Sequence, residues 1–332
     1  MRRLSAAWAS IEGFWSEKEP ATSLAVVRIG LALCLVYDLL HIWQLDLVLP
    51  LFGPEELGGL SHGHTRDPLP LWLRLFPPSA ASAMALHGAM LAASTTLLLG
   101  FFTRTSAAVL LALWLQWSQL LPTGDRGIDQ LCRHILVILT FAPSGYALSV
   151  DAFLRTKSFV GDGLPVPSWG RKLIIGQMVL MYFTAGILKT GVTWWPMGGY
   201  AALFFALHDP SVAAYDFTWT KAQPWFFLTQ VGTSMTVVYQ VTYPLTLVLL
   251  LWRRRPELGG KLGRWCTRWR VEWLWLAIGA WFHISLGVLM NLGIFPWAML
   301  ALYPAWVAPD EWTHLRQRAL AWLGRSPRTE PA

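Results

Sequence analysis

The chain has 332 residues, of which 55% are hydrophobic and only 14% are charged. Soluble globular chains usually carry about 25% charged residues, so this composition excludes that class and indicates an integral membrane protein. The net charge of +7 does not indicate nucleic-acid binding, because the basic residues collect between apolar segments and no soluble basic domain is present. The three cysteines are widely separated and form no CxxC pair, which predicts neither a disulfide framework nor a zinc site.

The N-terminal tail, residues 1–20, is too polar for the apolar core of a signal peptide. Trp8, Ile11 and Trp15 fall on one side of a helix, which favours a short helix lying in the membrane interface. A loosely ordered cytosolic tail is the alternative for this segment.

Eight segments that follow are apolar and approach the length of a membrane span, which needs about 20 residues. The eighth is short, so a tilted, half-buried or re-entrant helix is equally compatible with it. The sequence therefore predicts an all-α fold, a polytopic membrane helical bundle of about eight transmembrane helices, formed as a single domain over residues 1–332. The predicted spans are 22–43, 82–101, 104–121, 130–149, 172–190, 229–252, 272–291 and 294–308.

The placement of lysine and arginine predicts the topology. With a cytosolic N-terminus, 19 of the 26 basic residues lie in cytosolic segments or at the cytosolic ends of spans, five lie in outer segments or at the outer start of a span, and the other two are Arg28 and Lys189, within spans. Because basic residues accumulate in cytosolic loops, we expect a multi-pass protein of the cell inner (plasma) membrane with both termini cytosolic, including a tail over 309–332. The outer segments 44–81 and 191–228 are too long for turns, and loops of this size often cover a cavity.

Lys189 lies near the outer end of the fifth predicted span, where an ammonium group is costly. It shares a helix face with Tyr182, Ala185 and Gly186, and the two small residues leave room for a ligand or a neighbouring helix. One interpretation is that Lys189 snorkels to an interfacial belt that includes Trp194. The other is a general base, because desolvation in an apolar pocket disfavours the charged form of lysine.

Further ionisable residues gather in the outer half of the predicted bundle. Asp38 and His41 are one helical turn apart, so they can share a hydrogen bond or simply be solvated at the interface. Asp129 and Arg133 open the fourth span at i and i+4, a spacing that favours an ion pair at the helix start over a catalytic device. This distribution is typical of a pocket open to the extracytoplasmic side.

The remaining polar residues have simpler expected roles. Arg28 is deep in the first span and is expected to bond a neighbouring helix. His283 lies in the middle of the seventh span, where a satisfied core histidine is the default, and Asn291 lies at the outer end of that span. His62 and His64 are two ligands in one loop, which is too weak a pattern to predict a metal site.

With these residues placed, the chain resembles the vitamin K-dependent gamma-carboxylase family, specifically its membrane core, the horizontally transferred transmembrane (HTTM) domain. The most specific likeness is the Ala-Gly-x-x-Lys segment ending at Lys189 and followed by tryptophan and glycine. The Gly-x-x-x-Arg of Gly100 to Arg104 and the Ser-Val-Asp ending at Asp151 also resemble the family, and Arg28, Arg104 and Asp151 are expected to be structural. The similar stretches are VRIGLALCLVYD, LLLGFFTRTSAAVLL, LTFAPSGYALSVDAF, YFTAGILKTGVTWWPMGGY and FHISLGVLMNLGIFPWAMLALYPAW.

The resemblance implies an enzyme that uses a quinol of the vitamin K type. In the carboxylases the lysine matching Lys189 deprotonates vitamin K hydroquinone. The resulting anion reacts with O2 to give a strong base and eventually the quinone epoxide, and CO2 adds to the glutamate carbanion of a peptide. By this reading Lys189 and His283 are catalytic. The expected quinol pocket comprises Asp38, His41, Asp129, Arg133, Tyr182, Trp194 and Asn291.

The chain also departs from the family pattern. It has Gly127 and Ile128 where the animal enzyme has an Asn-His pair, and Gln240 where the family often has an acid. The lumenal domain of the animal enzyme is not expected here. Two alternatives therefore stay open beside a quinol-dependent oxygenase or carboxylase that modifies a peptide or small molecule. One is a non-catalytic membrane factor that acts with a small partner protein in the maturation or export of a secreted peptide. The other is a protein that binds membrane lipids or quinones.

Overall fold

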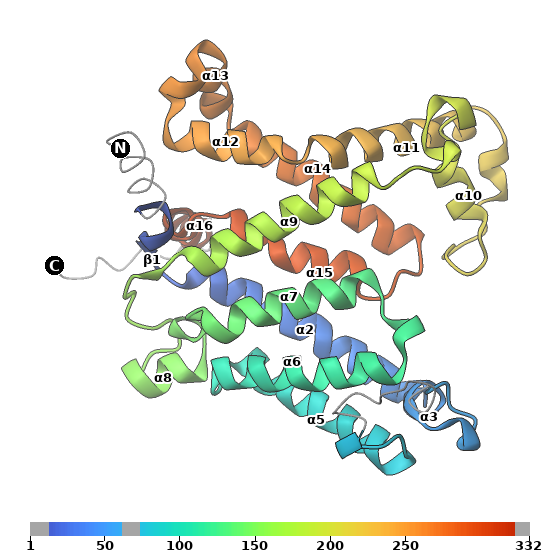
Figure 1. The fold of residues 1–332 in the computed structure, drawn as a ribbon. Helices are drawn as coiled ribbons and strands as arrows, with labels where there is room; N and C mark the ends of the chain where they lie inside the picture. Colours follow the sequence, from blue (N-terminus) through green and yellow to red (C-terminus); the bar gives the residue numbers. More distant parts are fainter. Residues whose placement is uncertain (1–12, 62–73, 323–332) are drawn as a thin grey trace, which may run out of the picture. The chain divides into compact units, whose positions relative to one another are not determined.

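The computed structural model describes residues 13–61 and 74–322. This part of the chain is predominantly helical, as predicted, with one short antiparallel ribbon in which β1 (Lys18–Glu19) pairs with β2 (Val166–Pro167) (Figure 1). The interfacial helix predicted from Trp8 and Ile11 and the loop histidines His62 and His64 lie outside the described residues.

The chain forms two compact units, the first comprising residues 1–174 with 301–332 and the second residues 175–300. The boundaries fall inside two helices, α9 (Trp169–Ile187) and α15 (Phe295–Leu302). Each unit is described by itself below.

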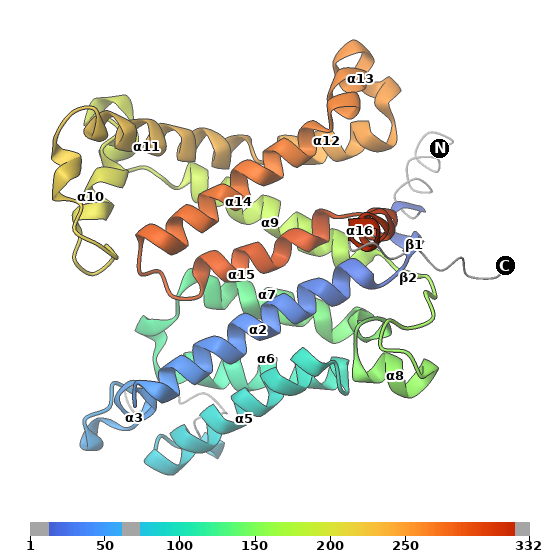
Figure 2. The same ribbon diagram turned by 180° about the vertical axis from the view of Figure 1, so that it is seen from behind.

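The first unit is built around four long helices. Its longest, α2, is apolar on all sides and buries Leu24, Leu31 and Leu35 in the core, as expected for a helix surrounded by protein and lipid. Helix α2 packs on α5, α5 on α6, and α6 on α7 (Figures 1 and 2). The helices of this unit are α2 (Thr22–Gln44), α3 (Val48–Phe52), α5 (Ala80–Leu99), α6 (Thr103–Leu120), α7 (Gly127–Phe141), α8 (Val150–Thr156), the first turns of α9, and α16 (Pro309–Trp322).

The second unit contains a sharply bent helix pair. Helices α11 (Trp225–Thr242) and α12 (Leu245–Arg254) meet at Tyr243 and Pro244 with a bend of 54°. Proline has no N–H group to continue the helical hydrogen bonds, so the single predicted span 229–252 is broken at this point. The other helices are the remainder of α9, α10 (Ala202–His208), α13 (Gly260–Trp269), α14 (Val271–Leu289) and most of α15.

The expected count of eight spans is not confirmed. Among the described residues, three helices are by themselves long and apolar enough to cross a membrane, namely α2, α5 and α14, and the bent pair α11 and α12 makes a possible fourth. Helix α7 has only 15 residues and α15 only eight, which is short for a span of about 20 residues.

Several predicted boundaries were wrong for local reasons. The fourth span was expected to reach residue 149, but α7 ends at Phe141, because Pro143 follows and the chain enters a 3-10 turn over Ser144–Tyr146. The eighth ends as a helix at Leu302 and continues as a 3-10 turn that contains Pro304. The segment expected as a cytosolic tail from residue 309 begins with the helix α16.

Candidate functional site

Lys189 follows the last turn of α9, where the chain leaves the helix. Its half-buried side chain turns back, and Nζ donates a hydrogen bond of 3.1 Å to the carbonyl of Ala185. The ammonium also lies 4.6 Å from the centre of the Trp194 ring, within the range of a cation–π contact. Trp195 fixes the segment by donating its indole N–H to the Lys189 carbonyl at 2.7 Å. Within residues 13–61 and 74–322 no carboxylate pairs with Lys189, so neutral groups alone hold the ammonium.

Tyr182 and His283 form a hydrogen-bonded pair in the second unit. The Tyr182 hydroxyl and Nε2 of His283 are 2.5 Å apart, and both side chains are buried. Tyr243 stacks on Tyr182 with ring centres 4.1 Å apart, and Tyr239 meets both tyrosines edge-on. The result is a buried cluster of three phenolic rings and an imidazole contributed by α9, α11, α14 and the turn that follows α11.

Gln240 lies on α11 beside the same stretch of α9. It is buried, and its carbonyl oxygen Oε1 has no hydrogen-bond partner among the described residues. A side chain at Gly186 would place Cβ 2.9 Å from the Val241 nitrogen and 3.0 Å from Cβ of Gln240, so the small residue serves the close approach of α11. Gly186 is four residues from Tyr182 and three from Lys189. Gln240 is thus packed against α9 at Gly186, which lies between Tyr182 and Lys189 in the sequence.

Asn291 has a different setting from the one expected. It lies just beyond the end of α14, and its side chain donates to the carbonyl of Ala213 at 3.2 Å while its backbone N–H donates to Val212 at 2.7 Å. These bonds attach the 209–214 loop to the end of α14. The exposed side chain is therefore bonded to a loop and not to the tyrosine cluster.

Asp38, Asp129 and Arg133, which were expected in the quinol pocket, belong to the first unit. Arg126 bonds two of them, Asp38 and Asp129. One guanidinium nitrogen, Nη2, donates to Asp38 at 2.8 Å and to Asp129 at 3.0 Å, and Nε donates to Asp129 at 2.9 Å. Burial disfavours the charged form of Arg126, but its bonds to Asp129 and Asp38 outweigh that effect and raise its pKa above the ordinary value. Asp129 also accepts the Arg126 backbone N–H and so caps the start of α7.

In this cluster the expected pair Asp129–Arg133 was wrong, and of the two alternatives for Asp38 and His41 the shared hydrogen bond is not formed. Asp129 does not pair with Arg133, because Arg126 occupies it, and Arg133 instead forms a two-pronged ion pair with Asp125 at 2.7 Å. Asp38 does not bond His41, since Arg126 holds the carboxylate while the exposed His41 stacks on Tyr37 with ring centres 5.9 Å apart. Ion pairs with Arg126 and Asp125 therefore hold these charged groups in fixed positions.

Arg28 is completely buried at the other end of the first unit. It donates to the carbonyls of Ser144 at 2.7 Å and Leu148 at 2.5 Å, both in the segment after α7. Gly100 makes room for it, because an added Cβ would lie 2.8 Å from Nη1 of Arg28 and 2.4 Å from Cβ of Ser149. Gly100 also has a φ of +66°, a conformation that other residues adopt at a cost.

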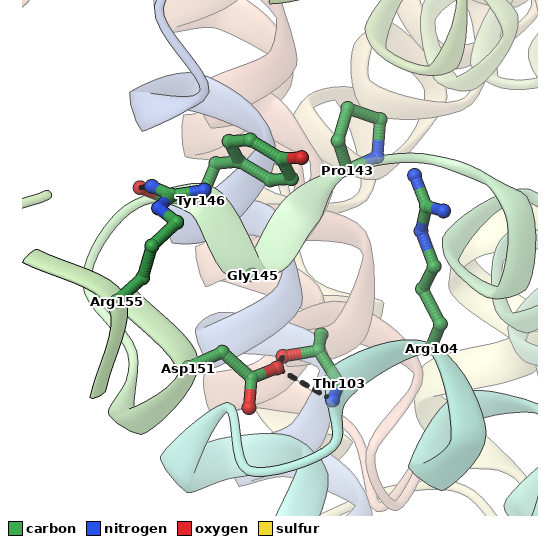
Figure 3. Close-up of a pocket in the computed structure, with 7 residues that line it drawn as sticks. All are labelled: Thr103, Arg104, Pro143, Gly145, Tyr146, Asp151 and Arg155. Atoms are coloured by element: carbon green, nitrogen blue, oxygen red, sulfur yellow. Dashed lines mark hydrogen bonds between the residues drawn. The ribbon is translucent and has the colours of Figure 1, made fainter. Parts of the chain in front are cut away.

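Asp151 caps the start of α6 (Figure 3). Its carboxylate accepts hydrogen bonds from the backbone N–H groups of Phe102 at 2.9 Å and Thr103 at 2.8 Å, and from the Thr103 hydroxyl at 2.6 Å. An acid is favourable at a helix N-terminus. Arg104 lines the adjacent open hollow of about 270 Å³, and its exposed side chain has no hydrogen bond or ion pair with the described residues. The bonds of Asp151 are those of a structural residue, whereas nothing in these contacts assigns that role to Arg104.

The segments picked out by sequence therefore meet in two places. Arg28, Gly100 and Asp151 join at one end of the first unit, and Tyr182 joins His283 in the second. Two features were not predicted from the sequence: Arg126, one of the five basic residues of the outer segments, and the tyrosines of the YQVTY segment, Tyr239 to Tyr243. The i, i+4 spacing of these two tyrosines is a signal that they share a helix face.

The second unit contains the groups that a reactive phenol would need. These groups are a lysine with neutral partners, a buried amide oxygen without a partner among the described residues, and packed aromatic rings. A lysine in its neutral form can accept a proton, and an amide oxygen can accept a hydrogen bond from a hydroxyl. In the first unit, the charged groups around Arg126 and Arg133 are held in ion pairs.

A family model for the HTTM domain matches residues 16–255. The matched range includes Arg28, Gly100, Asp151, Lys189 and Gln240, whereas His283 lies beyond it. No solved structure matches the chain. Together with the apolar helices α2, α5 and α14, the match identifies a membrane protein, and the chain belongs to the HTTM domain family.

Proposed function

We propose that this HTTM protein is a membrane enzyme of the vitamin K-dependent carboxylase type, in which Lys189 takes a proton from a bound quinol. The observation that carries the proposal is the set of neutral partners around Lys189, namely the Ala185 carbonyl and the Trp194 ring. A lysine whose only role is to carry a positive charge would be better stabilised beside a carboxylate. A general base needs neighbouring groups that do not fix it in its protonated, charged form.

Side chains of the second unit fit a quinol. The buried Oε1 of Gln240 lacks a partner among the described residues, and a quinol hydroxyl is a donor of the right kind for it. Trp194 and the tyrosine cluster offer aromatic faces against which a flat ring packs. When bound, a quinol supplies electrons for the reduction of oxygen.

The chain's own residues then have separate tasks. Lys189, in its neutral form, accepts the phenolic proton at Nζ and becomes an ammonium that the Ala185 carbonyl and the Trp194 ring stabilise. Gln240 orients the ring by accepting a hydrogen bond. Tyr182 and His283 fix the packing of α9 on α14, and their buried hydrogen bond keeps the cluster ordered. The substrate modified by this chemistry is a peptide or small molecule reaching the site from the extracytoplasmic side.

The test is the replacement of Lys189 by arginine. Arginine preserves the charge, can snorkel, and cannot give up its proton in the working range. Membranes containing Lys189→Arg should lose quinol consumption by at least about 100-fold, the lower end of what a general base contributes, at unchanged expression. Lys221→Arg, at an exposed lysine of the same unit, should consume quinol normally. Quinol consumption by Lys189→Arg at the native rate would overturn the proposal and favour the non-catalytic membrane factor.

A further inference from the structure

Helix α13 (Gly260–Trp269) presents three distinct faces. One face packs on α12: Gly263 and Cys266 are buried, and the Thr267 hydroxyl donates to the carbonyl of Trp252 at 3.1 Å. A Cβ at Gly263 would lie 3.4 Å from the Trp252 ring. The second unit therefore fixes α13 through this face and leaves the other side of the helix uncovered by it (Figure 1).

The uncovered side carries an apolar stripe. Leu262, Trp265 and Trp269 are 58%, 54% and 66% exposed. At 100° per residue, they fall within an arc of about 60° along the helix. Large apolar side chains clustered in this way on a surface mark a contact with another molecule or with lipid.

A basic stripe runs directly beside the apolar one. Lys261, Arg264 and Arg268 are exposed and also occupy an arc of about 60°. None of the three makes a side-chain hydrogen bond or ion pair with the described residues. The surrounding stretch, residues 253–270, contains seven basic residues against one acid, Glu257. The exposed side of α13 is therefore strongly positive and strongly apolar at once.

We propose that α13 is an interfacial helix that binds the anionic surface of the leaflet on its own side of the membrane. Parallel apolar and basic stripes suit a helix lying in the plane of the interface, where Trp and Leu enter the acyl region and Lys and Arg meet lipid phosphates. A neutral partner would leave the basic stripe unused, whereas an anionic lipid surface matches both stripes. The charge distribution places this segment on the cytosolic side, and the inference does not depend on the role of Lys189.

The experiment measures the depth of α13 in the full-length protein. Cys34, Cys132 and Cys266 are replaced by alanine, and a nitroxide label is attached at Leu262→Cys. The protein is placed in lipid nanodiscs of phosphatidylcholine alone or mixed with phosphatidylglycerol. Collision of the label with oxygen, which concentrates in the bilayer, is compared with collision with a water-soluble nickel chelate.

With phosphatidylglycerol the label should favour oxygen, and with phosphatidylcholine alone it should favour nickel. Each of Lys261→Gln, Arg264→Gln and Arg268→Gln should lower the ratio of inserted to free helix about fivefold. The exposed Lys157→Gln in the first unit should leave the ratio unchanged. High salt should weaken insertion of the unsubstituted helix, because it screens exposed charges, and this measurement requires no charge substitution.

Two results would overturn the proposal. Nickel access that is equally high in both lipids would mean that α13 stands in water, free to meet a cytosolic protein. Shielding from both reagents in both lipids would mean that the stripe is buried against protein, such as a second copy of the chain.

Discussion

The hydroxyl of Tyr182 on α9 and Nε2 of His283 on α14 share a buried hydrogen bond of 2.5 Å. This bond joins two helices of the second unit that are about 100 residues apart in sequence. Lys189 lies seven residues after Tyr182, about 10 Å further along the α9 direction. The pair is thus suited to hold the aromatic cluster in place, while proton transfer is the role that we propose for Lys189.

Replacement of Tyr182 by phenylalanine should therefore cost stability more than it costs binding. The loss of the hydroxyl removes a buried bond to His283, worth about 1–3 kcal/mol, while the ring can still stack on Tyr243. Thermal unfolding in detergent measures this loss. Tyr37→Phe is the matched control, because Tyr37 is 59% exposed. An unchanged unfolding temperature for Tyr182→Phe would contradict the structural role of the bond.

Arg28→Ala should reduce the yield of folded protein. The substitution leaves the carbonyls of Ser144 and Leu148 without their donor and opens a void in the packed end of the first unit, at a cost of about 3 kcal/mol or more. Arg104→Ala, at an exposed arginine whose side chain has no partner among the described residues, should stay within about 0.5 kcal/mol of the native chain. Size-exclusion chromatography of the two variants in detergent gives the comparison. A well-folded but inactive Arg28→Ala protein would instead assign Arg28 a role in activity.

The sequence predicted best those features that depend on a long uninterrupted pattern. Helices α2, α5 and α14 begin and end within three residues of their predicted limits, since each is one apolar run. The break in the sixth span was missed, because the apolar pattern continues through Pro244 and only the fold decides whether a proline kinks or ends a helix.

The candidate site could be predicted only in part, for a related reason. Helical spacing correctly placed Tyr182 and Gly186 on one helix, but α9 ends at Ile187, two residues before Lys189, and spacing also suggested the pair Asp129–Arg133. Spacing within a helix gives no information on competing residues in a loop. Here Arg126 pairs with Asp129, and Asp125 pairs with Arg133. The bond from Tyr182 to His283 has no sequence signal at all, because it joins two helices that only tertiary packing brings together.

The predicted topology can be tested at described and exposed positions. Cysteines introduced at Glu56, in the outer segment 44–81, and at Lys157, in a cytosolic segment, should react with a membrane-impermeant maleimide from opposite sides of the membrane. Intact cells should label Glu56→Cys, and inverted membrane vesicles should label Lys157→Cys. Labelling of both positions in intact cells would refute the orientation derived from the basic residues.

The last prediction concerns Gln240, whose buried amide oxygen has no partner among the described residues. A buried acceptor without a donor costs about 1–3 kcal/mol, so Gln240→Leu, which has a similar volume, should be as stable as the native chain or more stable. If the oxygen serves a quinol hydroxyl, the same variant should bind a quinone analogue about 10-fold more weakly, since one hydrogen bond is worth about 1.4 kcal/mol. Thermal unfolding with and without the analogue measures both quantities. Thr236→Val, one turn earlier on α11 with its hydroxyl bonded within its own helix, is the control for substitution of this helix. Lower stability together with unchanged binding in Gln240→Leu would mean that the amide has a protein partner, and the quinol would then have to be oriented by another group.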